Sequence, residues 1–148
     1  MKRIVLQTFI LLIVSCAAGL LVNRVSGTRV QLFRRYVPAG KYQISVAVAS
    51  PLLNFHREGQ RIVFLDVRPP EVFRAGCIPG AVNVPDQAVN PELLEKVLRA
   101  PGVVCYGDDL GEAIELAAQL RERGVLTCVA LTEGWQGWKT GRYPTSQP

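Results

Sequence analysis

Between residues 61 and 131, short apolar runs rich in β-branched residues alternate with segments that have the composition of helices. The predicted strands are 61–67, 81–84, 103–106 and 125–131. The predicted helices are 71–75, 91–99 and 112–123, and a further amphipathic segment runs over 44–57. Strands that alternate with helices are joined by right-handed crossovers and lie parallel in one sheet. The pattern therefore predicts an α/β domain with a mostly parallel sheet.

The first 23 residues contain an apolar stretch, 4–22, without a charged side chain. As a helix rising ~1.5 Å per residue, this stretch just spans a hydrocarbon core of ~30 Å. We expect residues 1–23 to form an uncleaved transmembrane helix in the inner membrane of a bacterium. Two alternatives stay open: a cleaved signal peptide, and a lipoprotein signal in which the letters IVSC at 13–16 make Cys16 the lipidated residue.

The net charge of +5 belongs to the amino-terminal part of the chain. Before residue 43 the sequence contains seven basic residues and no acidic one. From residue 43 onward it contains 10 basic and 12 acidic residues. We therefore expect a basic linker at 24–42 and a slightly acidic domain at 43–145. Because nucleic-acid-binding domains carry a basic face, no nucleic-acid partner is expected. Positive charges flank both ends of the apolar stretch, so they do not decide on which side of the membrane the domain lies.

The cysteines have no metal-binding spacing. Cys16, Cys77, Cys105 and Cys128 form no C-x-x-C pair, and the single histidine, His56, is not placed near any of them. No metal or cofactor is expected. Cys105 and Cys128 lie in apolar strand-like runs, where a cysteine is usually a small buried hydrophobe.

Several spaced motifs resemble the rhodanese family. They are FLDVR at 64–68, EVF at 71–73, GCIPGAVNVP at 76–85, VVCY at 103–106, the A-x-x-L-x-x-x-G pattern at 117–124, GWQGW at 134–138 and GRYP at 141–144. The resemblance covers about 43–145. It implies a central parallel sheet of about five strands with helices on both faces. In active members of the family it implies transfer of a sulfane sulfur from thiosulfate or a protein persulfide to a thiol.

Most of these motif residues have a structural interpretation. Asp66 and Arg68 stand where a predicted strand ends and the chain turns, and Glu71, the third scaffold residue of the motif, opens the short helix or turn predicted at 71–75. We expect the Asp66 carboxylate to accept hydrogen bonds from the backbone or from an arginine and so to fix that corner. Trp135 and Trp138 are three residues apart and are expected to pack in or near the core at the sheet edge.

The resemblance places the nucleophilic cysteine directly after the strand 103–106, at position 107, and position 107 is glycine. The loop equivalent to the active-site loop consists of Gly107, Asp108, Asp109, Leu110, Gly111 and Glu112. A persulfide cycle needs a thiolate, which backbone N–H groups and a nearby cation stabilise. Three carboxylates and no cation would instead raise the pKa of a thiol and repel thiosulfate. The acidic side chains either bind a cation or a basic partner, or simply complement the dipole of the following helix.

Two functions stay open. The first is a catalytically inactive rhodanese-like module that is held at a membrane by its N-terminal helix and binds or regulates a protein partner. The second is a thiosulfate or persulfide sulfurtransferase that uses a relocated cysteine, Cys105 or Cys77. Cys105 faces the core in the simplest strand register, whereas Cys77 stands in a turn that we expect to be exposed.

Overall fold

The structure, a computed structural model, describes residues 42–57 and 60–148. All of them belong to one compact unit, Val37–Pro148. The predicted anchor at 1–23 with Cys16, and the predicted linker apart from Tyr42, lie outside the described residues. Of the helices that are described, none is long and apolar enough to cross a membrane.

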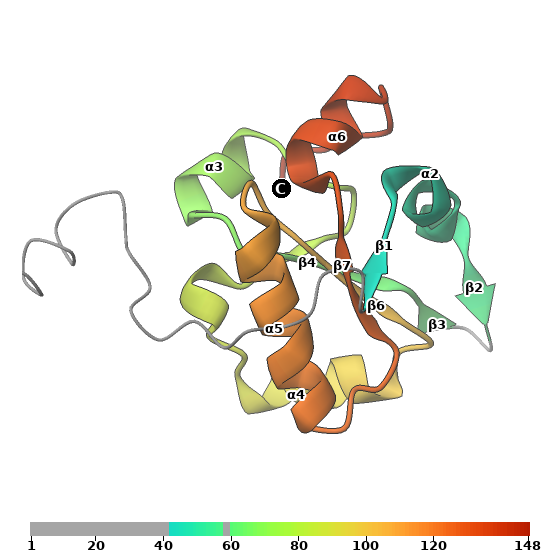
Figure 1. The fold of residues 1–148 in the computed structure, drawn as a ribbon, viewed down its shortest axis with the longest axis vertical. Coiled ribbons are helices and arrows are strands. Elements are labelled where there is room, and N and C mark those ends of the chain that lie inside the picture. The colour runs from blue at the N-terminus through green and yellow to red at the C-terminus, as the bar shows by residue number, and fades with distance from the viewer. Residues whose placement is uncertain (1–41, 58–59) are drawn as a thin grey trace, which may run out of the picture. The chain divides into compact units, whose positions relative to one another are not determined.

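A five-stranded sheet forms the centre of the domain (Figure 1), with the strand order β1-β7-β6-β4-β5. Its strands are β1 (Gln43–Ile44), β4 (Val63–Asp66), β5 (Val82–Asn83), β6 (Val103–Tyr106) and β7 (Cys128–Leu131). Every pair of neighbours is parallel. A separate antiparallel pair consists of β2 (His56–Arg57) and β3 (Gln60–Arg61). The prediction of a parallel sheet of about five strands is confirmed.

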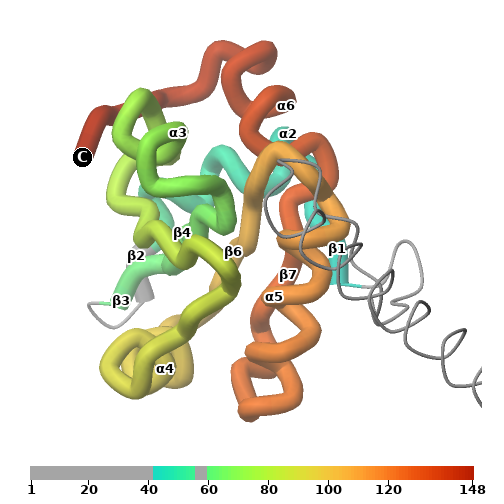
Figure 2. Tube along the Cα trace, turned by 90° about the vertical axis from the view of Figure 1, so that its left-hand side faces the viewer, coloured from blue at the N-terminus to red at the C-terminus, as the bar shows by residue number. Residues whose placement is uncertain are grey.

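Helices cover both faces of the sheet, as predicted (Figures 1 and 2). One layer consists of α4 (Pro91–Arg99) and α5 (Leu110–Glu122), and the other of α2 (Val46–Ala49), the 3₁₀ helix η1 (Ser50–Asn54) and α6 (Gly134–Thr140). Side chains alternate along each strand, so Leu65 and Cys105 pack in the first layer while Phe64 and Tyr106 pack in the second. At the carboxyl edge of the sheet, α3 (Pro70–Ala75) follows β4.

The amphipathic segment 44–57 does not form one continuous helix. The helix α2 ends at Ala49 and continues as 3₁₀ turns, because Pro51 has no N–H to donate to the preceding turn. Ser45 precedes α2 but makes no side-chain cap. The carboxylate of Glu133 accepts a hydrogen bond from the Val46 N–H instead, at 2.9 Å, so a residue near the end of the chain caps this helix.

The helix α5 begins at Leu110, two residues earlier than predicted. Asp109 is its N-cap, and its Oδ1 accepts a hydrogen bond of 2.7 Å from the N–H of Gly111. Leu110, Gly111 and Glu112, which we expected in or beside a loop, therefore belong to the first helical turn. Between β6 and α5 only residues 107–109 remain outside regular structure.

Candidate functional site

Gly107 lies directly after β6, at the carboxyl edge of the sheet, and it is buried. A Cβ atom on Gly107 would lie 2.6 Å from Cγ2 of Val67, far inside the contact distance of two carbon atoms. Val67 is itself buried and packs in the core layer under α5. The space that a side chain at position 107 would need is therefore filled by a methyl group of Val67.

The helix α6 closes a second side of this position. The Gly107 carbonyl accepts a hydrogen bond of 2.9 Å from the N–H of Trp135. Gly134, just before it, has a φ of +56°, and a Cβ there would collide with the same carbonyl oxygen. Glycine at 134 allows both the left-handed backbone and this close approach. The loop after β6 is thus held tightly between β4 and α6.

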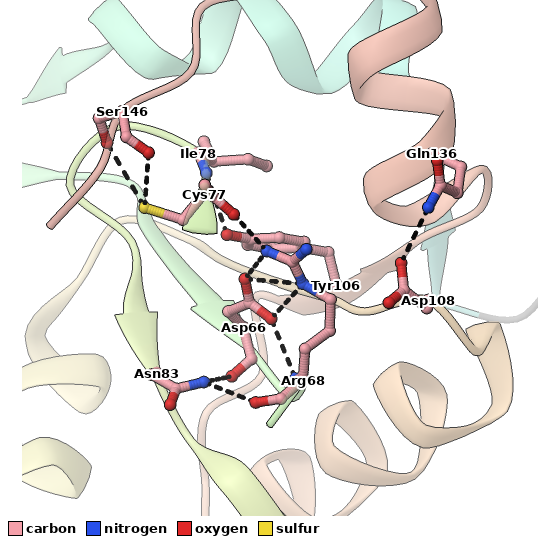
Figure 3. A network of polar contacts seen from close by, with 10 residues as sticks. Asp66, Arg68, Cys77, Ile78, Asn83, Tyr106, Asp108, Gln136 and Ser146 are labelled. Atoms are coloured by element: carbon pink, nitrogen blue, oxygen red, sulfur yellow. Dashed lines mark hydrogen bonds and ion pairs between the residues drawn. The ribbon is translucent and has the colours of Figure 1, made fainter. Parts of the chain in front are cut away.

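The acidic side chains of the loop are placed at the start of α5. Asp109 caps the helix, Glu112 stands in its first turn, and Asp108 is exposed beside Gln136, whose Nε2 lies 3.5 Å from Asp108 Oδ1 (Figure 3). Carboxylates in a first turn complement the helix dipole. In the described ranges, no group of three or more His, Cys, Asp or Glu side chains comes together to hold a metal ion.

Asp66 and Arg68 form a buried ion pair at the corner after β4 (Figure 3). Arg68 Nη2 lies 2.6 Å from Asp66 Oδ2, and Arg68 Nε donates to Asp66 Oδ1 at 2.9 Å. The backbone N–H of Arg68 donates to the same carboxylate, and Nη2 also reaches the carbonyl of Gly76 at 2.8 Å. The prediction that the Asp66 carboxylate fixes this corner is confirmed. Glu71, the third residue of the motif, is exposed in the first turn of α3.

The guanidinium of Arg68 is enclosed by aromatic rings. Its Cζ lies 4.4 Å from the ring centre of Trp135 and 5.7 Å from that of Tyr106. Burial by itself lowers the pKa of Arg68, but the hydrogen bonds and charge of Asp66 outweigh it and raise that pKa. Burial also raises the pKa of Tyr106, whose hydroxyl accepts a hydrogen bond from the Ile78 N–H. Arg68 is therefore a permanent internal charge that holds the corner together.

The two candidate replacement nucleophiles are both buried. Cys105 is 0% exposed, its Sγ lies 3.5 Å from Sγ of Cys128, and burial raises its pKa well above the usual range. Cys77 is 1% exposed, so the expectation of an exposed turn is wrong. The chain near its carboxyl end covers it: Cys77 and Ser146 pair as an isolated bridge, and Cys77 Sγ lies 3.4 Å from Ser146 Oγ (Figure 3).

Two residues that sequence reasoning missed are essential parts of this region. Val67 fills the space beside Gly107, but a valine at the end of an apolar strand has no signal that distinguishes it from any core residue. The side chain of Asn83 donates to the main-chain oxygens of Asp66 and Arg68, at 3.1 and 2.8 Å. Asn83 could have been singled out, because a polar residue within a short apolar strand usually has hydrogen-bond partners.

Comparisons with known proteins agree with the motifs. The profile of the rhodanese-like domain family matches residues 51–140. The chain is 30% identical over 113 residues to the protein named thiosulfate sulfurtransferase 16, chloroplastic, of Arabidopsis thaliana, a match that covers 69% of this chain and 90% of that protein.

Among solved structures, the fold is similar to that of the BH2092 protein of Bacillus halodurans, with a TM-score of 0.61, 21% identity and coverage of 71% of this chain and 76% of that one. The Alr3790 protein of Anabaena sp. gives a TM-score of 0.57 at 21% identity, with coverage of 71% of this chain and 82% of that one. The chain thus belongs to the rhodanese-like domain family and is related to its sulfurtransferases.

Proposed function

We propose that this chain is a membrane-tethered rhodanese-like domain without sulfurtransferase activity, which acts as a binding or regulatory module. The observation that carries the proposal is the structure around Gly107. In the position where the family resemblance implies a cysteine, the chain has no side chain, and the Val67 methyl group occupies the adjacent space. A sulfur-carrying group has neither an attachment point nor room there.

The charges near Gly107 support the same proposal. Asp108 and Asp109 are exposed next to the loop, and thiosulfate is a dianion that such carboxylates repel. The nearby cation, Arg68, is engaged by Asp66 and enclosed by Trp135. Within the described residues its Nη1 makes no hydrogen bond, but this atom is itself buried, so Arg68 presents no exposed cation to a thiolate or an incoming anion.

The alternative function, sulfur transfer by Cys105 or Cys77, has less support. A nucleophilic cysteine must be accessible and must ionise near neutral pH. Both side chains are buried, and the raised pKa of Cys105 keeps that thiol protonated.

A sulfur-transfer assay tests the proposal. The full chain in detergent is incubated with thiosulfate and cyanide, with an active rhodanese as the positive control, and thiocyanate is measured. Mass spectrometry then looks for an adduct of about 32 Da, the mass of one added sulfur. We expect neither product, and Cys105→Ser and Cys77→Ser should leave the result unchanged. Thiocyanate formation that disappears in either variant would establish the alternative function instead.

An engineered nucleophile extends this test. Gly107→Cys alone should give no activity, because Val67 leaves no room and the nearby acids disfavour the thiolate. Adding Val67→Ala makes room, and adding Asp108→Asn and Asp109→Asn removes two charges while keeping a residue that can cap α5. Val67→Ala should increase the persulfide yield of the new thiol, which the mass adduct measures. The two Asp→Asn changes should lower the pKa of that thiol, which thiolate absorbance against pH measures.

The membrane tether in the proposal rests on the sequence. The uncharged apolar stretch at 4–22 is long enough for a transmembrane helix, and we propose the inner membrane of a bacterium as its location. Membrane fractions washed with alkaline carbonate should retain the full chain. Processing that globomycin blocks would favour the lipoprotein alternative, with Cys16 as the lipidated residue.

A further inference from the structure

The chain enters the domain at the amino-terminal edge of the sheet. Tyr42 directly precedes β1, and its carbonyl accepts a hydrogen bond of 2.8 Å from the Ala130 N–H in β7. The Cζ atom of Arg121, in the last turn of α5, lies 3.6 Å from the ring centre of Tyr42. The same guanidinium donates to the carbonyls of Leu126 and Cys128. The entry point is therefore fixed beside the turn that joins α5 to β7.

Two exposed leucines flank this turn, and we call them the leucine patch. Leu126, within the turn, is 68% exposed, and Leu98, near the end of α4, is 47% exposed. Leu98 reaches the turn, because its Cδ2 lies 3.6 Å from the position where a Cβ on Gly124 would stand. Figures 1 and 2 show α4 and the carboxyl end of α5 at the same end of the domain, away from α6. A single exposed leucine is ordinary, but these two lie together beside the entry point of the chain.

The basic linker joins the domain at this same place. Residues 24–41 contain five basic residues and no acidic one, and the last of the five, Lys41, immediately precedes Tyr42. Basic residues that follow a transmembrane helix are attracted to anionic lipid headgroups. An anionic membrane therefore attracts the linker up to the residue at which the domain begins.

The linker also limits how far the entry point can move from the bilayer. Tyr42 follows Val22, the last residue of the apolar stretch, by 20 positions, which span at most ~70 Å when fully extended. Each basic residue that binds lipid shortens this distance further. Of all faces of the domain, the face beside Tyr42 is therefore the one that the chain brings closest to the lipid.

We infer that the leucine patch contacts an anionic lipid surface, with Leu98 and Leu126 inserted among the headgroups. The inference rests on the proposed membrane tether and deepens it by naming the face of the domain that meets the bilayer. The linker supplies the electrostatic attraction, since Arg99, next to Leu98, is paired with Glu95 at 3.5 Å, and the leucines supply the apolar contact. Because all strands of the sheet are parallel, the edge that carries Gly107 then faces away from the membrane and is open to a partner.

Quenching of fluorescence by lipids tests the inference. The full chain is reconstituted into vesicles of phosphatidylglycerol and phosphatidylcholine in equal parts, and some of the lipids carry bromine on their acyl chains. Leu98→Trp and Leu126→Trp each add a reporter to the patch, and the unaltered chain gives the background of the buried Trp135 and Trp138. Val72→Trp is the matched control, because Val72 is an exposed apolar residue on α3, at the carboxyl edge of the sheet.

We expect brominated lipid to lower the emission of the added tryptophans at 98 and 126 by about twofold or more and to leave that at 72 unchanged. Vesicles of phosphatidylcholine alone should remove the difference between the three positions. Replacement of Arg29, Arg34 and Arg35 by glutamine should have the same effect in the anionic vesicles, because it removes three of the five linker charges.

Equal quenching at all three positions would overturn the inference, as would full quenching at 98 and 126 in phosphatidylcholine alone. A blue shift of the emission at 98 or 126 without quenching would also overturn it, because protein rather than lipid would then cover the patch. Washing the same vesicles with alkaline carbonate tests the tether separately. A chain that is retained but not quenched leaves the tether in place and removes only this inference, whereas a chain that is released removes both.

Discussion

Replacement of Gly107 by alanine tests whether Val67 fills the space beside it. The new Cβ would lie 2.6 Å from Cγ2 of Val67, while carbon atoms in contact prefer ~3.5–4.0 Å, so the two groups must separate by about 1 Å. Overpacking of this kind costs ~1–3 kcal/mol. Gly107 does not have a positive φ, so alanine adds no backbone strain and removes ~0.4–1 kcal/mol of unfolded-state entropy. We expect the free energy of unfolding to fall by about 1–2 kcal/mol.

A double-mutant cycle with Val67→Ala isolates this contact. Val67→Ala alone removes buried methyl groups and should cost ~1–3 kcal/mol, whereas in the double variant the alanine at 107 occupies part of the freed space. The double variant should therefore lose about 1–2 kcal/mol less than the two single effects together. Urea unfolding of residues 38–148, followed by the fluorescence of the buried Trp135 and Trp138, measures each value. Additivity within ~0.5 kcal/mol would refute the argument that Val67 blocks position 107.

Three further predictions follow from the same region and from the tether. Gly134→Ala should destabilise the domain more than Gly107→Ala, because it combines a left-handed φ with a collision against the Gly107 carbonyl; thermal unfolding measures the difference. Arg68→Met should cost ~3–5 kcal/mol, since it leaves the Asp66 carboxylate buried without its partner, and restoring stability with Asp66→Asn in the same chain would confirm the cause. Deletion of residues 1–37 should give a folded domain with cooperative urea unfolding, because Val37–Pro148 forms one compact unit; a truncated chain that aggregates would contradict this.

Much of the architecture could be predicted because its signals are local. The bounds of α4 and β6 match the predicted ranges, and Asn90 caps α4 through a side-chain hydrogen bond to the Leu93 N–H. β6 is a four-residue apolar run between Gly102 and Gly107, so its position in the sequence is narrowly defined. The corner at Asp66 was also predictable, because a carboxylate at a strand end needs hydrogen-bond donors and Arg68 is two residues away.

The elements that escaped prediction depend on distant contacts. β1 has only two residues and exists because it pairs with Ala130 and Leu131 of β7. α6 contains glycines at 134 and 137 that weaken its intrinsic helix propensity, and the burial of its tryptophans stabilises it. The predicted strands at 61–67 and 125–131 are shorter in the structure, since pairing partners exist for only part of each apolar run.

At the candidate site, the sequence identified Gly107 and the acidic side chains that follow it, but not the residues that pack against Gly107 and Cys77. That Cys77 is buried depends on the chain near residue 146, which is 69 positions away. That Gly107 has no free space beside it depends on Val67, which directly follows β4, the strand next to β6. Contacts of this range cannot be read from spacing along the chain.

The pairing of β1 with β7 has a consequence for the order in which the domain can form during synthesis. The carbonyls of Tyr42, just before β1, and of Ile44 in β1 accept hydrogen bonds from the N–H groups of Ala130 and Thr132, far along the chain, and the cap of α2 comes from Glu133. On the ribosome, β1 and α2 are the first elements of this domain to emerge, and their partners follow only when nearly the whole domain has been translated. Closing so large a loop is entropically costly and slows folding, so the nascent chain exposes the apolar start of the domain for the longest time.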